Sequence, residues 1–308
     1  MQLYLGYEAS DDLLEKLSRT GFEGCWRTYE HPHGERVDWD LVHAIGQALG
    51  RTSIDLVVSD VACREKSAFA SYRVWGGRFP NEPYVTDGSD VLVASPEFSL
   101  MLAAAELSDT RLMQMVMRYC GCYSPNPSSP DGFDGRPPMT SIAQVEELLA
   151  QVSGVPGAKR LRRALRWSAE MSRSPMETNL MLALTLPKTS NGFGLPKPEM
   201  NKLIRLEGLA AEIAGKTHCY GDLVFGDYIL EYQGRRHNDT IGDDLTRALA
   251  LELMGFTVDF VAYEQFRDAR QLDLVARRAA KAMGRWVDSR KWHEVWRAQE
   301  LVDLLLKG

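Results

Sequence analysis

The stretch from Thr217 to Arg247 constrains the fold most, because it carries acidic side chains where packing alone would not put them. Two runs rich in Val, Ile, Leu, Phe and Tyr flank Gly226-Asp227, a dipeptide suited to a two-residue hairpin turn. With the turn there, the strands pair Asp222 with Glu231. The same register pairs Phe225 with Tyr228, Val224 with Ile229 and Leu223 with Leu230. The sequence therefore predicts a β-hairpin on which two carboxylates face each other.

The two faces of this hairpin are expected to differ in chemistry. Side chains alternate along a strand, so Asp222, Glu231 and Gln233 share one face. The other face is apolar and suits a core; it carries Leu223, Phe225, Tyr228, Leu230 and Tyr232. Directly opposed like charges, about 4.5–5.5 Å apart at Cβ, destabilise a strand pair, and a cation is the simplest compensation. Oxygen ligands on rigid strands suit Mg²⁺ or Mn²⁺. In a register slipped by one residue, the acids would instead be ordinary solvent-facing side chains.

Asp222, the run Glu231-Tyr232-Gln233 and an upstream helical glutamate, Glu177, resemble the pattern of the PD-(D/E)xK nuclease superfamily. The segment EYQGRRH followed by DDLTRALALELMGFTV is similar to the branch that includes the very-short-patch-repair endonucleases. The resemblance covers roughly Ser174 to Asp268. It implies an α/β (α+β) fold with a restriction-endonuclease-like core, a mixed sheet flanked by helices. The superfamily's lysine falls at Gln233 in this chain, and related branches also lack that lysine.

The resemblance also implies a site that binds Mg²⁺ or Mn²⁺. Its expected metal ligands are Asp222, Glu231, Glu177 and the carbonyl group of Tyr232. Its expected catalytic residues are the three acids together with Gln233 and His237, which would orient the attacking water. An imidazole titrates near neutrality, so His237 suits a general base; the alternative is a hydrogen-bonded loop histidine.

Glu177 also has an interpretation that needs no metal. Ser174-Pro175-Met176-Glu177 has the pattern of a capping box, with Ser174 as the N-cap and Glu177 reaching back to the Ser174 amide. Considered alone, this pattern makes Glu177 structural. The resemblance makes it an outer metal ligand held through water, and both roles stay open.

Charge is distributed unevenly along the chain. The 308 residues carry a formal net charge of −6, so the whole molecule is no general polyanion binder. Basic residues nevertheless flank the acidic centre, as expected where a phosphate backbone is brought to a metal site, with DNA as the expected partner. The candidate nucleic-acid contacts are Arg162, Arg163, Arg166, Arg235, Arg236 and Arg247. The alternative is that these charges only solvate helix faces.

The chain is predicted to form an N-terminal α/β module at 1–122, a linker rich in Pro, Gly and Ser at 123–140, and the nuclease-like domain at 141–308. The segment VTDGSDVLVASPEFSLMLAAAEL resembles the amino-terminal half of AbiEi-like antitoxin proteins, which implies binding to DNA or a partner. A protein partner would bind this module or the C-terminal helix.

The spacing of apolar residues along the chain predicts its secondary structure. Helices are expected at 11–18, 38–49, 141–151, 158–170, 243–254 and about 268–306. Strands are expected at 54–59, 70–75, 91–94, 200–205 and 256–261, and an insertion or loop at 208–216.

Several classes of protein are disfavoured by composition. Five cysteines without a CxxC pair provide neither a disulfide framework nor a zinc site, and His31, His33 and His43 are expected to be surface histidines. The chain has neither an 18-residue apolar run nor the features of a secretory signal, so we expect a cytoplasmic protein with no membrane partner.

These observations lead to a metal-dependent endonuclease that hydrolyses phosphodiester bonds, with DNA as the expected substrate. The alternative is a catalytically inactive nuclease-fold protein that binds DNA or acts as an antitoxin-like regulator, which Gln233 in place of lysine favours. A structural protein with no nucleic-acid partner is a third option, favoured by the acidic net charge. Strand state, sequence specificity, oligomeric state and pathway stay open.

Overall fold

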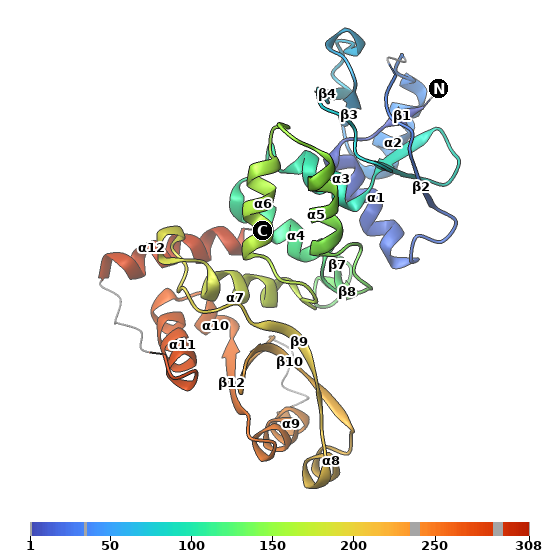
Figure 1. The fold of residues 1–308 in the computed structure, drawn as a ribbon. Helices are drawn as coiled ribbons and strands as arrows, with labels where there is room; N and C mark the ends of the chain where they lie inside the picture. Colours follow the sequence, from blue (N-terminus) through green and yellow to red (C-terminus); the bar gives the residue numbers. More distant parts are fainter. Residues whose placement is uncertain (1, 34–35, 235–240, 286–291, 308) are drawn as a thin grey trace. The chain divides into compact units, whose positions relative to one another are not determined.

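The computed structural model describes residues 2–33, 36–234, 241–285 and 292–307. The chain is a mixed α/β protein that divides into two compact units, Met1–Arg166 (unit 1) and Trp167–Gly308 (unit 2) (Figure 1). No helix within the described ranges is both long and apolar enough to span a membrane.

Unit 1 contains a four-stranded mixed sheet and a two-stranded parallel sheet. The larger sheet has the order β1 (Leu3–Tyr4), β6 (Val91–Ala94), β5 (Tyr84–Thr86) and β2 (Trp26–Thr28), and the smaller sheet pairs β3 (Ile54–Val58) with β4 (Ala70–Val74). The helices are α1 (Tyr7–Arg19), α2 (Trp39–Leu49), η1 (Val61–Cys63), α3 (Pro96–Ala103), α4 (Asp109–Tyr119), α5 (Ile142–Gln151) and α6 (Ala158–Trp167). The elements predicted at 38–49, 54–59, 70–75 and 91–94 are confirmed, whereas α4 and the short strands β1, β2 and β5 were not predicted.

The segment 123–140 differs from the predicted linker. It forms a short hairpin of β7 (Tyr123–Pro125) and β8 (Phe133–Gly135), and its next residue, Arg136, is buried. The Arg136 guanidinium donates to the carbonyl groups of Gly121 and Arg118, both at 3.0 Å. Because these bonds fasten the segment to α4, the observed division of the chain falls after Arg166, and α5 lies in unit 1.

Unit 2 contains a four-stranded sheet with the order β12 (Thr257–Ala262), β11 (Tyr228–Gln233), β10 (His218–Phe225) and β9 (Glu199–Arg205). β9, β10 and β11 pair antiparallel, and β12 joins β11 in parallel after the crossover helix α9 (Ile241–Leu253). The other helices are α7 (Pro175–Thr185), η2 (Lys188–Ser190), α8 (Gly208–Ala214), α10 (Tyr263–Phe266), α11 (Ala269–Ala282) and α12 (Trp292–Leu306). Residues 208–214 are therefore helical rather than a loop, and the predicted C-terminal helix is instead two helices, α11 and α12.

Three of the four residue pairs predicted for the hairpin are confirmed. Leu223 pairs with Leu230, Val224 with Ile229 and Phe225 with Tyr228. Gly226 lies in the turn with φ of 66°, a conformation that glycine adopts without a steric penalty.

Both faces of the hairpin are covered. The predicted apolar face is buried at Leu223, Phe225, Tyr228 and Leu230. The face expected to carry the acids also contributes Val224 and Ile229 to a core cluster with Ala248 and Leu251 of α9. In this unit α8 and α9 lie side by side, which Figure 1 shows. A parallel strand reached by a crossover helix brings that helix onto the sheet, so the acids lie at the edge of a packed face.

Candidate functional site

A cleft of ≈ 520 Å³ in unit 2 brings most of the predicted acids together. Its walls come from the start of α7, from β9, from the end of α8, from β10 and from α9. The lining residues are Arg173, Glu177, Asn201, Leu206, Ala214, Lys216, His218, Cys219, Tyr220, Asp222, Thr246 and Arg247. Glu231 lies directly behind this surface, since its carboxylate accepts a hydrogen bond from the cleft residue Arg247.

Asp222 and Glu231 lie close together, as the hairpin register predicts. The Asp222 carboxylate accepts a hydrogen bond of 2.8 Å from the backbone N–H group of Tyr232, the residue after Glu231. Glu231 is only 2% exposed, and its Oε2 atom accepts from Arg247 at 3.1 Å. No described residue donates a hydrogen bond to its Oε1 atom. A buried carboxylate oxygen without a donor is costly and needs a proton or a cation.

The electrostatics of the acids reflect this crowding. Burial, followed by the charge of Asp222, raises the pKa of Glu231 to about 9. The same two causes, in the same order, raise the pKa of Glu177 to about 7. Carboxylates that share a desolvated site resist simultaneous ionisation, so the site favours a bound cation or retained protons.

Glu177 lies in the first turn of α7, where half of the predicted capping box is confirmed. Ser174 Oγ accepts from the Glu177 amide at 3.1 Å. The Glu177 side chain reaches back to the amide of Arg173 at 2.9 Å, one residue before the predicted Ser174 amide. The Glu177 Oε2 atom accepts that hydrogen bond and a second one from Asn201 Nδ2. Glu177 therefore caps its helix and lines the cleft at the same time.

Asn201 was missed by the sequence analysis. The β9–β10 register places it opposite Asp222, and it adopts φ of 46°, which is rare for a residue with a side chain. Its Nδ2 atom donates to Glu177 Oε2 at 2.6 Å and to the Met171 carbonyl at 3.0 Å. Asparagine within an apolar strand pattern is the available signal, because it is disfavoured in strands yet tolerates left-handed backbone.

Replacing Asn201 with alanine is expected to destabilise unit 2 by about 1–3 kcal/mol, because a buried Glu177 oxygen loses a donor and alanine must take the left-handed conformation. Asn201→Gly removes the donor but keeps the backbone conformation, so it should cost less. Urea unfolding of both variants measures the difference. Equal stability of Asn201→Ala and the wild type would contradict the assigned role.

Cationic and aromatic side chains form the rest of the cleft wall. The predicted contact Arg247 lies there, on α9. Arg173, Lys216 and His218 are additional basic residues that the sequence analysis did not select for the site. The Arg173 guanidinium carbon lies 4.0 Å from the centre of the Tyr220 ring. The alternation His218, Tyr220, Asp222 along β10 is the sequence signal that predicts one shared wall.

The other predicted site residues are not among the described residues that line this cleft. Gln233 ends β11 opposite Ala262 and is not among the lining residues. Arg235, Arg236 and His237 lie outside the described residues. Arg162, Arg163 and Arg166 are exposed on α6 in unit 1, where Arg162 donates to the Leu149 carbonyl at 2.8 Å and Arg163 pairs with Asp109.

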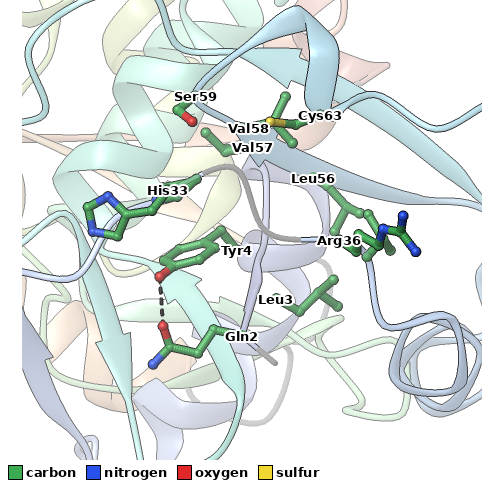
Figure 2. Close-up of a pocket in the computed structure, with 12 residues that line it drawn as sticks. Gln2, Leu3, Tyr4, His33, Arg36, Leu56, Val57, Val58, Ser59 and Cys63 are labelled. Carbon is green, nitrogen blue, oxygen red and sulfur yellow. Dashed lines mark hydrogen bonds between the residues drawn. The ribbon is translucent and has the colours of Figure 1, made fainter.

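A smaller pocket in unit 1 does not form a comparable site. It has a volume of ≈ 30 Å³ and is lined by β1, β3 and residues near His33 (Figure 2). Tyr4 donates to Gln2 Oε1 at 2.7 Å, and Figure 2 shows His33 and Arg36 directed to opposite sides. That volume holds roughly one or two water molecules.

In the described part of the chain, no group of three or more His, Cys, Asp or Glu side chains is arranged to hold a metal ion.

No protein-family model, curated protein or solved structure matches the chain significantly.

Proposed function

We propose that unit 2 is a metal-dependent endonuclease of the PD-(D/E)xK type that hydrolyses phosphodiester bonds, with DNA as its substrate. The observation that carries the proposal is the convergence of Glu177, Asp222 and Glu231, from one helix and two strands, beside a cleft that also contains Arg173 and Arg247. The mixed sheet with helices packed on it supports the finer fold assignment, because the resemblance implies that arrangement.

The donor types suit a hard divalent cation, because carboxylate and carbonyl oxygens are the ligands that Mg²⁺ prefers. Asp222 and Glu231 would hold Mg²⁺ or Mn²⁺ directly, with Glu177 as an outer ligand through water and the Tyr232 carbonyl completing the shell. The Oε1 atom of Glu231, which accepts no hydrogen bond from the described residues, supports this proposal, because a cation would compensate the charge of the ionised carboxylate. When bound, the metal would increase the acidity of the attacking water and offset charge that develops on the phosphate.

The protein's own residues would carry out the remaining tasks. Asn201 and the Arg173 amide orient the Glu177 carboxylate. The Tyr232 amide orients Asp222. Gln233 and His237 stay proposed as residues that orient the attacking water. Arg247 donates a hydrogen bond to Glu231 Oε2 and places a positive charge beside the acids.

A catalytically inactive, DNA-binding or antitoxin-like regulator is the second candidate. The pairing of Arg247 with Glu231 favours it, because the guanidinium already compensates one of the acids. Gln233 at the position of the superfamily's lysine favours it as well. With this second function, the cleft would bind nucleic acid without hydrolysing it.

The test is an assay of plasmid and oligonucleotide cleavage by the full chain with Mg²⁺ or Mn²⁺, beside EDTA. We expect cleavage that requires the metal, and calorimetric binding of Mg²⁺ to the metal-free protein. Nucleic-acid binding without cleavage under any of these metal conditions would support the regulatory candidate. Absence of salt-dependent nucleic-acid binding at low ionic strength would exclude both and favour a structural role.

A further inference from the structure

One wall of the cleft has a composition that metal binding does not require. His218, Tyr220 and Asp222 are alternate residues of β10, and all three line the cleft. The rings of His218 and Tyr220 lie 6.0 Å apart at 87°. This wall therefore runs from the acids at Asp222 to an aromatic and basic end at His218.

Arg173 is held against this wall in a specific way. Its guanidinium lies over the Tyr220 ring at 4.0 Å, within the range of a cation–π contact. No described residue accepts a hydrogen bond from the Arg173 guanidinium, and none forms an ion pair with it. The two arginines that line the cleft thus differ, because Arg247 pairs with Glu231.

A guanidinium held over an aromatic ring is well prepared to bind phosphate. The ring contact restricts the side chain without using its N–H groups, so the fork of donors stays available for a bidentate contact with phosphate. The backbone of the same residue is fixed by its amide bond to Glu177. The position of Arg173 is therefore linked to that of the Glu177 carboxylate.

We propose that Arg173, held over the Tyr220 ring, binds a backbone phosphate of the nucleic acid next to the phosphodiester that lies at the acids. This inference rests on the proposed function, because it takes that bound strand as its ligand. It assigns Arg173 and Tyr220 as a binding pair, with Tyr220 as the residue that positions the guanidinium.

The experiment measures binding of a fluorescent oligonucleotide by the full-length, metal-free protein across a range of NaCl concentrations. Arg173→Ala should weaken binding roughly tenfold at low salt and reduce the slope of log K against log salt by about one, as expected for the loss of one phosphate contact. Tyr220→Leu should act in the same direction, and Tyr220→Phe should bind like the wild type because it keeps the ring. The double variant Arg173→Ala/Tyr220→Leu should be no weaker than Arg173→Ala.

Arg267→Ala is the matched control, since Arg267 is exposed and pairs with Glu264 outside the cleft. It should leave affinity and salt slope unchanged. If Arg173→Ala binds the oligonucleotide with the wild-type affinity and the wild-type slope of log K against log salt, this inference is overturned. The proposed function would still stand if the wild type binds and cleaves nucleic acid. Binding of inorganic phosphate or a mononucleotide without binding of the oligonucleotide would also overturn it. Absence of any binding by the wild type would overturn both proposals.

Discussion

Asp222→Asn is expected to reduce metal-dependent cleavage at least about 10³-fold while leaving the fold intact. Asp222 is the central acid of the site, since its charge raises the pKa of both Glu177 and Glu231. Asparagine keeps the shape and the acceptor for the Tyr232 amide but loses the negative charge that binds the metal. A metal contributes several kcal/mol to the transition state, and about 1.4 kcal/mol corresponds to tenfold in rate. Single-turnover cleavage in Mg²⁺ measures the effect.

Asp227→Asn is the matched control for this substitution. Asp227 is an exposed acid in the turn of the same hairpin and does not line the cleft. The Asp227→Asn variant should cleave at the wild-type rate. If Asp222→Asn retains wild-type cleavage with its fold unchanged, the acids of this cleft are not the catalytic site.

Glu231→Gln is expected to stabilise the metal-free protein at pH 8 but not at pH 4. The pKa of Glu231 is raised to about 9 in the folded state, above its ordinary value of 4.5. Between those values the folded state holds a proton that the unfolded state has released, so the free energy of unfolding falls as the pH rises. Glutamine has no proton to lose and keeps an acceptor for Arg247. The gain at pH 8 should amount to several kcal/mol, because each pKa unit corresponds to about 1.4 kcal/mol.

Urea unfolding in EDTA at the two pH values measures this difference. Addition of Mg²⁺ should stabilise the wild type more than the variant, since a ligand that binds only the folded state raises the free energy of unfolding. Equal effects of Glu231→Gln at pH 4 and pH 8 would mean that the pKa of Glu231 is the same in the folded and unfolded states. The raised pKa would then be wrong, and the case for a cation at this carboxylate would lose its electrostatic support.

Local chemistry is the reason the hairpin could be predicted. Gly226-Asp227 specifies a two-residue turn, and the turn sets the register that pairs Leu223 with Leu230. The same register correctly predicts that Asp222 and Glu231 are neighbours. Ser174 as the N-cap of α7 is a local signal of the same kind.

Long-range packing decided what the sequence pattern missed. The segment 123–140 contains residues typical of a linker, yet Arg136 bonds it to unit 1. Asn201 and Arg173 belong to the site because β9 and the start of α7 meet β10, which no spacing along the chain reveals. Arg162 and Arg163 are adjacent to the nuclease-like segment in sequence but belong to the other compact unit.

The sequence by itself therefore determined the hairpin, its register and the proximity of its two acids, because these depend on turn chemistry and on the alternation of side chains. Only the tertiary structure decided which other groups share the cleft and which carboxylates carry raised pKa values. The reason is that burial and contacts between distant segments depend on how helices pack on the sheet.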